Sequence, residues 1–437
     1  MQAFKANIYK KMKFKRYLIH FFIIILIILN TLCPLSLAAQ TNLENTPSIS
    51  AEAAILIDAR TGAVLFEKNS ETKMYPASTT KILTSIIALE KCNLDDIVTV
   101  QNSAIKTIPA GYSSAYLSEG EQISVKDLLK VFLVHSANDA GNILAEHISG
   151  SVDNFSNLMN EKANEIGCKN SHFLNPSGIH DDNHYTTAED LAKIASYCMK
   201  NSTFRAIVSM KSCTIDPTNK SDARTYKNTN DLLNPSSKYY ISECVGIKTG
   251  YTSEAKNCLI SAFTKNNLNL ISVVLGAPTL ESGASTRCTD SIELYKYGYS
   301  TYSIETLATK GSTMQTIEIE NATEESQNLN LILEDDVTLL KNIKKPNDSF
   351  QITLKNNISA PIKENDVLGT VTYTSCGLES TTNLIASHDV EAKTDYTKII
   401  ILIIIFVIIT LILILIMKIK KNNKKKSKKK SKYSKYW

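Results

Sequence analysis

The sequence predicts an α/β (α+β) protein in which helices pack on an antiparallel sheet, with a small all-β C-terminal domain and one C-terminal transmembrane helix after it. Three observations support this prediction. Residues 53–299 mix helical and strand-like apolar patterns. Residues 305–390 hold short β-type runs separated by Asn, Asp and Pro, and residues 399–417 are apolar except for Thr410. A length of 437 residues accommodates two or three folded units of about 100–200 residues each.

Basic residues gather at the two ends of the chain, so the net charge of +5 misdescribes the middle. Residues 1–16 hold six Lys and Arg, residues 418–437 hold eleven Lys, and neither segment contains an acid. The rest of the chain has 31 basic against 43 acidic residues, a net charge of −12. An acidic body is poorly suited to the phosphate backbone of nucleic acid, so we expect no nucleic-acid partner.

Both basic ends are expected to lie beside membrane segments. Residues 1–39 are typical of a signal peptide, with an apolar run at Phe21–Leu29 and a small-residue cleavage site at Ser36–Ala38. An uncleaved N-terminal anchor is the alternative. As a helix, residues 399–417 would span about 28 Å, close to the hydrocarbon thickness of a bilayer. Residues 418–437 would then be a basic cytoplasmic tail of a single-pass membrane protein whose middle region lies outside the cell.

The first elements of the middle region follow from apolar spacing and turn residues. Ala53–Ile57 and Ala63–Phe66 are apolar runs separated by a turn-like Asp58–Gly62 segment, which predicts a β-hairpin. Pro76 then opens an amphipathic pattern that predicts a buried helix of about twelve residues. Ser124 is expected to cap the next helix.

The later elements are predicted by the same signals. Helices are expected after a break at His135–Asn138 as far as Ile148, and at Asp153–Ile166, Thr187–Met199 and Thr286–Tyr299. Strands are expected at Ile260–Phe263 and Leu270–Leu275, which Asn266 and Asn267 join, and in the C-terminal domain at Thr316–Ile319, Leu329–Leu333, Phe350–Leu354 and Gly369–Tyr373.

Cysteine spacing argues against a metal site. Eight cysteines would remain after signal removal, namely Cys92, Cys168, Cys198, Cys213, Cys244, Cys258, Cys288 and Cys376. The sequence has no Cys-x-x-Cys and no close Cys–His pairing, so a zinc site is not expected. An even count in an exported chain permits disulfides, but a domain of this size does not need them, and we expect mostly buried free thiols.

Three short motifs with chemical potential follow one another: Ser78-Thr79-Thr80-Lys81, Ser136-Ala137-Asn138 and Lys248-Thr249-Gly250. Ser-x-x-Lys alone is weak, since it also begins at Ser70, Ser103, Ser253 and Ser427. Only Ser78 follows a Pro and a small residue and heads an apolar helix, where the helix dipole favours developing negative charge. Lys81 lies one turn later, and a buried lysine there can lose its proton and act as a base toward the hydroxyl. A plain helix cap is the alternative for Ser78.

The other two motifs would bring polar groups to a cleft. Ser136-Ala137-Asn138 interrupts two helices, so its side chains can point into a cleft, although an ordinary interhelical loop is the alternative. Lys248 and Thr249 on a strand edge, with Gly250 allowing close backbone approach, suit the binding of a carboxylate. The alternative for them is a hairpin end with a solvated lysine.

Taken together, the motifs resemble the active-site triplet of penicillin-binding proteins and serine β-lactamases. The resemblance is closest to the D-alanyl-D-alanine carboxypeptidase family of low-molecular-mass penicillin-binding proteins, on four segments: Tyr75–Lys81, His172–Gly178, His184–Ala188 and Gly246–Thr252. It covers about Glu52–Tyr299 and implies a β-lactamase/transpeptidase-like catalytic domain over residues 45–302. Residues 305–390 and the anchor fall where that family carries its own β-rich domain and anchor. Family members usually have an amphipathic anchor, whereas this one is uniformly apolar.

The resemblance implies a serine-type D-Ala-D-Ala carboxypeptidase on the cell-wall side of the membrane. Such an enzyme removes the terminal D-alanine from peptidoglycan stem pentapeptides, and β-lactam antibiotics acylate it. No metal or organic cofactor is needed. A β-lactamase or a non-catalytic β-lactam-binding protein are the alternatives. Against the first, the middle motif is Ser-Ala-Asn where a β-lactamase has Ser-Asp-Asn, and no Glu-x-x-Leu-Asn follows it.

The resemblance also implies a role for each motif residue. Ser78 would be the acylated nucleophile and Lys81 its general base. Ser136 would relay a proton to the departing D-alanine, and Asn138 would hydrogen-bond the stem peptide and Lys81.

On the substrate side, the resemblance implies that Lys248 and Thr249, followed by Gly250, bind the terminal carboxylate. The backbone N–H groups of Ser78 and Tyr251 would form the oxyanion hole. The histidines of the 172–184 segment are interpreted as shaping their loop, and His135 as a packing residue.

Overall fold

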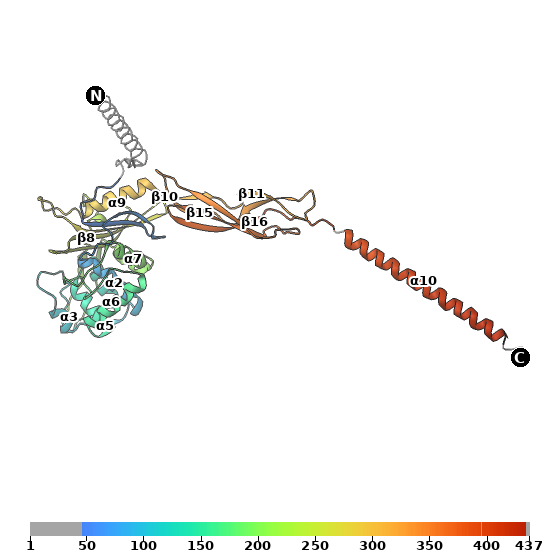
Figure 1. The fold of residues 1–437 in the computed structure, drawn as a ribbon. Coiled ribbons are helices and arrows are strands. Elements are labelled where there is room, and N and C mark those ends of the chain that lie inside the picture. The colour runs from blue at the N-terminus through green and yellow to red at the C-terminus, as the bar shows by residue number, and fades with distance from the viewer. Residues whose placement is uncertain (1–45, 395, 434–437) are drawn as a thin grey trace, which may run out of the picture. The chain divides into compact units, whose positions relative to one another are not determined.

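The computed structural model of the chain describes residues 46–394 and 396–433 (Figure 1). The predicted signal peptide and the last residues of the predicted tail lie outside these ranges. The central element is a five-stranded antiparallel sheet in the order β2–β1–β9–β8–β7. Its strands are β1 (Ala53–Asp58), β2 (Val64–Lys68), β7 (Cys244–Thr252), β8 (Lys256–Lys265) and β9 (Leu268–Ala277).

The predicted hairpins of this sheet are confirmed. β1 pairs with β2 as expected, and β8 and β9 pair across Asn266 and Asn267. Both asparagines have positive φ, +49° and +64°, which is the geometry of a two-residue type I′ hairpin turn. Asn tolerates this region better than other non-glycine residues, so the turn follows directly from the sequence.

Helices cover both faces of the sheet, and this explains why all six residues of β1 are buried. Helix α9 (Arg287–Thr301) packs on one face, where Gly298 lies against Leu56 and Leu270. Helix α7 (Ala188–Met199) packs on the other face (Figure 1), where Ile55 and Ile57 join the main hydrophobic core.

The remaining helices form a cluster around α2. Their bounds are η2 (Ala77–Thr80, a 3₁₀ turn), α2 (Lys81–Lys91), α3 (Asn102–Lys106), α4 (Val125–Val134), α5 (Asn138–Ser149), α6 (Val152–Ile166) and α8 (Ser202–Val208). The predicted caps are confirmed, since the side chains of Ser124 and Thr187 accept hydrogen bonds from the backbone of Asp127 and Asp190. All eight residues from Lys81 to Ala88 are buried, so the first two turns of α2 lie inside the cluster.

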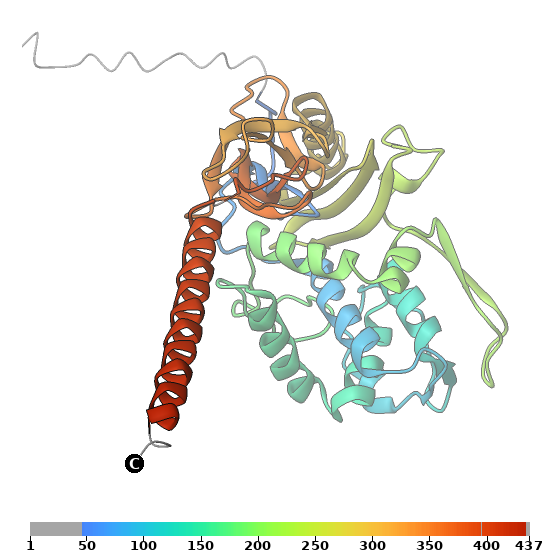
Figure 2. The ribbon, with the colours of Figure 1, turned by 90° about the vertical axis from the view of Figure 1, so that its right-hand side faces the viewer.

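Two small sheets lie beside the helices and were not predicted. β3 (Ile97–Thr99) pairs with β4 (Gln122–Ser124), and β5 (Ser212–Ile215) pairs with β6 (Arg224–Lys227). The second pair forms a long arm, yellow-green in Figure 2, beside the helices. These strands have three or four residues each, too few to establish a period.

The C-terminal part contains only strands, as predicted, and has its own apolar core. β10 (Tyr302–Ala308) pairs with β13 (Val337–Asn342). A five-stranded antiparallel sheet has the order β11–β12–β16–β15–β14, with bounds Thr313–Glu318, Asn328–Leu333, Leu378–Ala386, Val367–Ser375 and Ser349–Leu354. The four strands predicted here correspond to β11, β12, β14 and β15.

Helix α10 (Tyr396–Tyr433) contains the predicted membrane segment. Within its stretch Tyr396–Lys425, the most apolar 18-residue window has a mean hydropathy of 3.9, and this is the one helix among the described residues long and apolar enough to cross a membrane. All eight cysteines among the described residues are free thiols and six of them are buried, as expected.

Candidate active site

The three predicted motifs meet at one cleft of about 500 Å³. Ser78 comes from η2, Ser136 and Asn138 from the junction of α4 and α5, and Thr249 and Gly250 from β7. A larger cleft of about 700 Å³, beside α3 and α5, is lined by none of the motif residues. The convergence of side chains from three distant segments singles out the smaller cleft.

Ser78 is placed by a tight turn that depends on two close backbone approaches. Ala77 has a positive φ of +47°, an unusual conformation for a residue with a side chain. A Cβ on Gly178 would lie 1.7 Å from the Ala77 carbonyl oxygen, and one on Gly250 would lie 3.0 Å from the Ser78 nitrogen. The turn is therefore held between a loop and β7, each of which needs glycine at the contact.

Lys81 is fully buried and points at the Ser78 hydroxyl. Its Nζ lies 2.8 Å from Ser78 Oγ, 2.7 Å from Asn138 Oδ1 and 2.8 Å from the Ser177 carbonyl oxygen. The last two oxygens can only accept hydrogen bonds. A neutral Lys81 amine would therefore give its two N–H groups to them and turn its lone pair toward Ser78.

The surroundings of Lys81 favour that neutral amine. Burial holds the Lys81 pKa well below its ordinary value, and the charge of Lys248 lowers it further. Asp139 acts in the opposite direction and favours the protonated form of Lys81.

The middle motif has a strained backbone at Ser136 and hydrogen bonds that fix Asn138. Ser136 has a φ of +70° and is buried. The Asn138 backbone N–H and its Nδ2 both donate to the Ser113 carbonyl oxygen, at 2.8 and 3.0 Å. Because a carbonyl oxygen cannot donate, this contact fixes the Asn138 amide with Oδ1 toward Lys81.

The β7 side of the cleft carries cationic and hydroxyl groups. The Lys248 side chain is buried, and its Nζ donates to the Thr249 carbonyl oxygen at 2.9 Å. Burial and then the nearby charge of Arg287 lower the Lys248 pKa to about 7. The Thr249 and Thr229 hydroxyls lie 2.5 Å apart at the cleft wall, which Arg287 also lines.

Several of these residues could not be found from sequence motifs. Ser113 and Ser177 contribute only backbone carbonyl oxygens, which any residue type could supply. Thr229 and Arg287 lie in segments without a recognisable motif and reach the cleft only through the fold.

The histidine interpretation agrees with the structure. His184 is buried, its Nδ1 accepts from the Leu174 backbone N–H at 3.2 Å, and its Nε2 lies 3.0 Å from Thr80 Oγ1. Burial lowers its pKa to about 4, so the ring is neutral near pH 7 and braces its loop against η2. His135 packs against the Tyr226 ring with 4.7 Å between ring centroids. No cluster of His, Cys, Asp or Glu suited to a metal ion occurs among residues 46–394 and 396–433.

Comparison with known proteins agrees with this geometry. The family model described as D-alanyl-D-alanine carboxypeptidase matches residues 40–279, and the model of the penicillin-binding protein 5 C-terminal domain matches residues 302–392. The D-alanyl-D-alanine carboxypeptidase DacF of Bacillus subtilis is 33% identical over 383 residues, which are 85% of this chain and 92% of the relative. DacA of Haemophilus influenzae is 32% identical over 79% of this chain and 86% of its own length.

Solved structures of related enzymes are also similar to this chain. The crystal structure of penicillin-binding protein 5 from Haemophilus influenzae is 30% identical, with a TM-score of 0.60 over 79% of this chain and 99% of that one. A DD-transpeptidase of Streptomyces K15 is 34% identical, with a TM-score of 0.53 over 58% of this chain and 100% of that one.

Proposed function

The chain belongs to the D-alanyl-D-alanine carboxypeptidase family and is a serine peptidase with that activity, and we propose that it acts through a covalent acyl group on Ser78. The observation that carries this proposal is the buried Lys81 amine, 2.8 Å from Ser78 Oγ, with its other two contacts to acceptor oxygens. This is the arrangement required of a neutral lysine that removes the serine proton.

The first half of the proposed reaction forms the acyl-enzyme. Ser78 Oγ bonds to the carbonyl carbon of the penultimate D-alanine while its proton passes to Lys81 Nζ. The N–H groups of Ser78 and Tyr251 donate hydrogen bonds to the developing oxyanion, a contribution of about 3–4 kcal/mol per donor in other acyl-transfer enzymes. The C–N bond then breaks, and a proton relayed through Ser136 neutralises the departing amine of D-alanine.

The second half releases the shortened peptide. Water adds to the ester carbonyl carbon, the bond to Ser78 Oγ breaks, and the proton that the water loses returns to Ser78 through Lys81. The products are the truncated stem peptide and free enzyme. A β-lactam follows the first half of this path, because its strained amide presents a carbonyl carbon to the same hydroxyl.

Recognition of the substrate carboxylate is assigned to β7 and its neighbours. Thr249 and Arg287 line the cleft, so their hydroxyl and guanidinium groups are proposed to contact the carboxylate. Lys248 lies buried behind them and would add positive charge to the same place. Gly250 lets β7 approach Ser78 closely enough for the Tyr251 N–H to reach the oxyanion.

We also propose that α10 anchors the chain in the cell membrane. Its apolar stretch supports a single pass, and the Lys-rich segment after it supports a cytoplasmic C-terminus. The catalytic residues would then act on peptidoglycan from the cell-wall side.

The test uses Ser78→Ala in the full chain held in detergent. Fluorescent penicillin should not label this variant, and it should release no D-alanine from a pentapeptide ending in D-Ala-D-Ala, measured by mass spectrometry. Ser103→Ala is the matched control, because Ser103 begins another Ser-x-x-Lys but hydrogen-bonds to Glu146 on the surface. Undiminished labelling of folded Ser78→Ala would disprove the assignment of the nucleophile.

A further inference from the structure

One wall of the catalytic cleft is a loop whose position depends on a carboxylate that no step of the reaction uses. Residues 110–113 line the cleft, and the loop that carries them is closed at its base by backbone hydrogen bonds between Val100 and residues 120 and 121. Between the cleft and this base, residues 114–117 wrap around the side chain of Asp139.

Asp139 lies in the first turn of α5 and is 2% exposed. Its carboxylate accepts hydrogen bonds from Ser114 Oγ at 2.7 Å, from the Ala115 N–H at 3.0 Å and from the Leu117 N–H at 3.1 Å. Between the last two donors, Tyr116 has a φ of +56° and an 84% exposed side chain. The carboxylate therefore holds a strained backbone in place, and that hold is needed since a tyrosine rarely adopts this conformation unaided.

This clamp is linked to the catalytic lysine through one carbonyl group. Ser113, the residue next to the clamped segment, provides the carbonyl oxygen that both Asn138 nitrogens bind. The Asn138 amide is thereby turned so that Oδ1 faces Lys81 at 2.7 Å. If the Ser113 carbonyl moved, the Asn138 amide would be free to rotate, and Lys81 could lose the acceptor that orients its lone pair.

We propose that Asp139 is a positioning residue of the acylation reaction, which fixes the Ser113 carbonyl and, through it, the orientation of the Asn138 amide toward Lys81. This inference rests on the proposed roles of Ser78 and Lys81. The Asp139 carboxylate contacts neither the Ser78 hydroxyl nor the Lys81 amine, so its effect on their geometry passes through Ser113 and Asn138.

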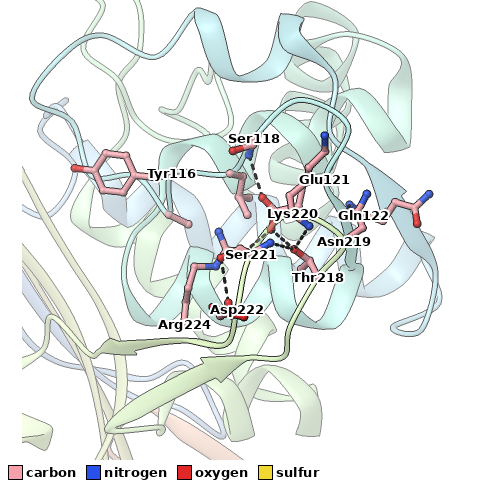
Figure 3. Close-up of polar contacts among 12 residues, drawn as sticks. Tyr116, Ser118, Glu121, Gln122, Thr218, Asn219, Lys220, Ser221, Asp222 and Arg224 are labelled. Atoms are coloured by element: carbon pink, nitrogen blue, oxygen red, sulfur yellow. Dashed lines mark hydrogen bonds and ion pairs between the residues drawn. The ribbon is translucent and has the colours of Figure 1, made fainter.

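Side chains also hold the base of the same loop (Figure 3). The fully buried Glu121 carboxylate pairs with Arg224 of β6 and accepts from Thr218 Oγ1 at 2.9 Å and from the Ser118 N–H at 3.0 Å. The Asn219 side chain bridges the backbone of residues 120 and 122. Figure 3 shows Tyr116 pointing away from this cluster.

This second attachment makes the proposal testable. Because Glu121 and Asn219 hold the loop at its base, loss of the Asp139 clamp should displace residues 113–117 without releasing the whole loop. The Tyr226 hydroxyl, which donates to the Ala115 carbonyl oxygen at 3.0 Å, would remain as a further restraint.

A change at Asp139 also has an electrostatic consequence that a purely structural residue lacks. Three titratable groups lie near Lys81: Asp139 of α5, Lys248 of β7 and the neutral His184 of the loop beside η2. Of these, Asp139 is the one whose charge raises the Lys81 pKa. Removing that charge lowers the pKa of Lys81, so the neutral, reactive amine persists to lower pH.

The experiment compares Asp139→Asn with the wild-type full chain by measuring the acylation rate with fluorescent penicillin from pH 5 to 9. We expect the acylation rate at pH 8 to fall about 30-fold or more. The NH₂ group of asparagine would face backbone N–H or hydroxyl donors that the Asp139 carboxylate oxygens now accept from, so the loop would lose part of its clamp. We also expect the acidic limb of the pH–rate profile to move to lower pH. Asp127→Asn is the matched control, because Asp127 occupies the first turn of α4 and pairs with Lys130 at 2.8 Å. It should leave both the rate and the limb unchanged.

Two outcomes would overturn the proposal. One is a folded Asp139→Asn protein that acylates within twofold of wild type at pH 8, whether or not its acidic limb moves. The other comes from Ser114→Ala, which keeps the Asp139 charge. Its acylation rate can be measured even if Asp139→Asn does not fold. That variant should slow acylation about threefold with the limb unmoved, and wild-type acylation in it would contradict the clamp. Failure of the proposed function is distinguishable, since it would appear as labelling of Ser78→Ala.

Discussion

At the scale of single residues, the site is organised by two buried lysines in different states. Lys81 is surrounded by acceptors and by a second cation, and its neutral form can serve as a base. Lys248, with its pKa lowered to about 7, can still be charged near neutral pH, and an arriving carboxylate would favour that charge. One lysine is thus suited to proton transfer and the other to binding an anion.

Lys248→Gln tests this division of roles. Removing the charge should reduce acylation by substrate or penicillin by about 2–4 kcal/mol of transition-state stabilisation, because both ligands present a carboxylate. For a substrate with an amidated C-terminus the loss should be much smaller. Steady-state kcat/KM for the acid and amide peptides provides the measurement.

The control for that variant is Lys256→Gln, which removes an exposed charge paired with Glu52 near the end of the same sheet. It should leave both substrates unaffected. If Lys248→Gln slows acid and amide substrates equally, Lys248 acts on Lys81 or on the fold, and its carboxylate role is wrong.

Most candidate site residues could be predicted from the sequence because three short motifs contain the side chains that the chemistry needs. Ser78 was separated from four other serines by its proline and by the apolar helix behind it. The contacts that tune the site could not be chosen, because Ser113 and Ser177 act through backbone atoms. Asp139 belongs to none of the three motifs, and its loop partners lie more than twenty residues earlier in the sequence.

At the scale of elements, the loop from Phe173 to His184 braces the turn that carries Ser78. Gly178 contacts Ala77 so closely that a Cβ would lie 1.7 Å from its carbonyl oxygen. His184 contacts Thr80 in the same turn. The predictions were right where the signal was local, as with the Ser124 and Thr187 caps. They missed β3 to β6, β10, β13 and β16, which are defined by pairing with strands elsewhere in the sequence.

Gly178→Ala should displace the turn that carries Ser78. A Cβ there meets backbone, which cannot yield like a flexible side chain, and φ is +75°. We expect loss of more than about 2 kcal/mol of stability together with nearly all penicillin labelling. Gly150→Ala is the matched control, since Gly150 has a φ of +77° with nothing within 4 Å of a Cβ. It should cost about 1 kcal/mol and leave labelling intact, and an equal effect of the two variants would exclude the steric explanation.

His184 gives the same loop a defined acid sensitivity. Its pKa is about 4 in the folded chain against 6.5 ordinarily, so between these values the unfolded chain binds a proton that the folded chain does not. The contribution of His184 to stability is therefore complete above pH 6.5 and is lost as the pH falls toward 4, by about 3 kcal/mol in total.

Urea unfolding followed by circular dichroism between pH 4 and 7.5 measures this effect. His184→Gln, which keeps a donor and an acceptor, should be less stable at pH 7 but lose less stability on acidification. His147→Gln, at an exposed position of α5, should retain the wild-type pH dependence. A wild-type acid slope in folded His184→Gln would assign the sensitivity to other groups.

At the scale of the whole molecule, the candidate site and the apolar helix α10 belong to different parts of the chain. Every residue placed in the site, from Ser78 to Arg287, precedes Tyr302, while the strands after it pack around a core of their own and α10 follows them. The sequence predicted this order of parts because the spacing of apolar residues differs among them: mixed helical and strand-like spacing, then short strand-like runs, then one continuous apolar stretch. It could not predict the contacts at the junction, such as the hydrogen bond from the Ile343 N–H to the Thr301 carbonyl oxygen at 2.9 Å.

This separation predicts that residues 46–302 alone retain the chemistry. Ending after Tyr302 preserves its hydroxyl contact with the Leu65 carbonyl oxygen at 3.3 Å and removes the partner of Thr301. Loss of this hydrogen bond, of the Lys344–Ser300 contact and of the Tyr302–Asn342 strand pairing should cost about 1–2 kcal/mol, which corresponds to a fall in Tm of roughly 2–8 °C. Acylation by fluorescent penicillin should stay within about threefold of the full chain, because no cleft residue is removed.

The same truncated chain carrying Ser78→Ala controls for non-specific labelling. A truncated chain that is folded by circular dichroism yet is not acylated would mean that the C-terminal strands complete the site.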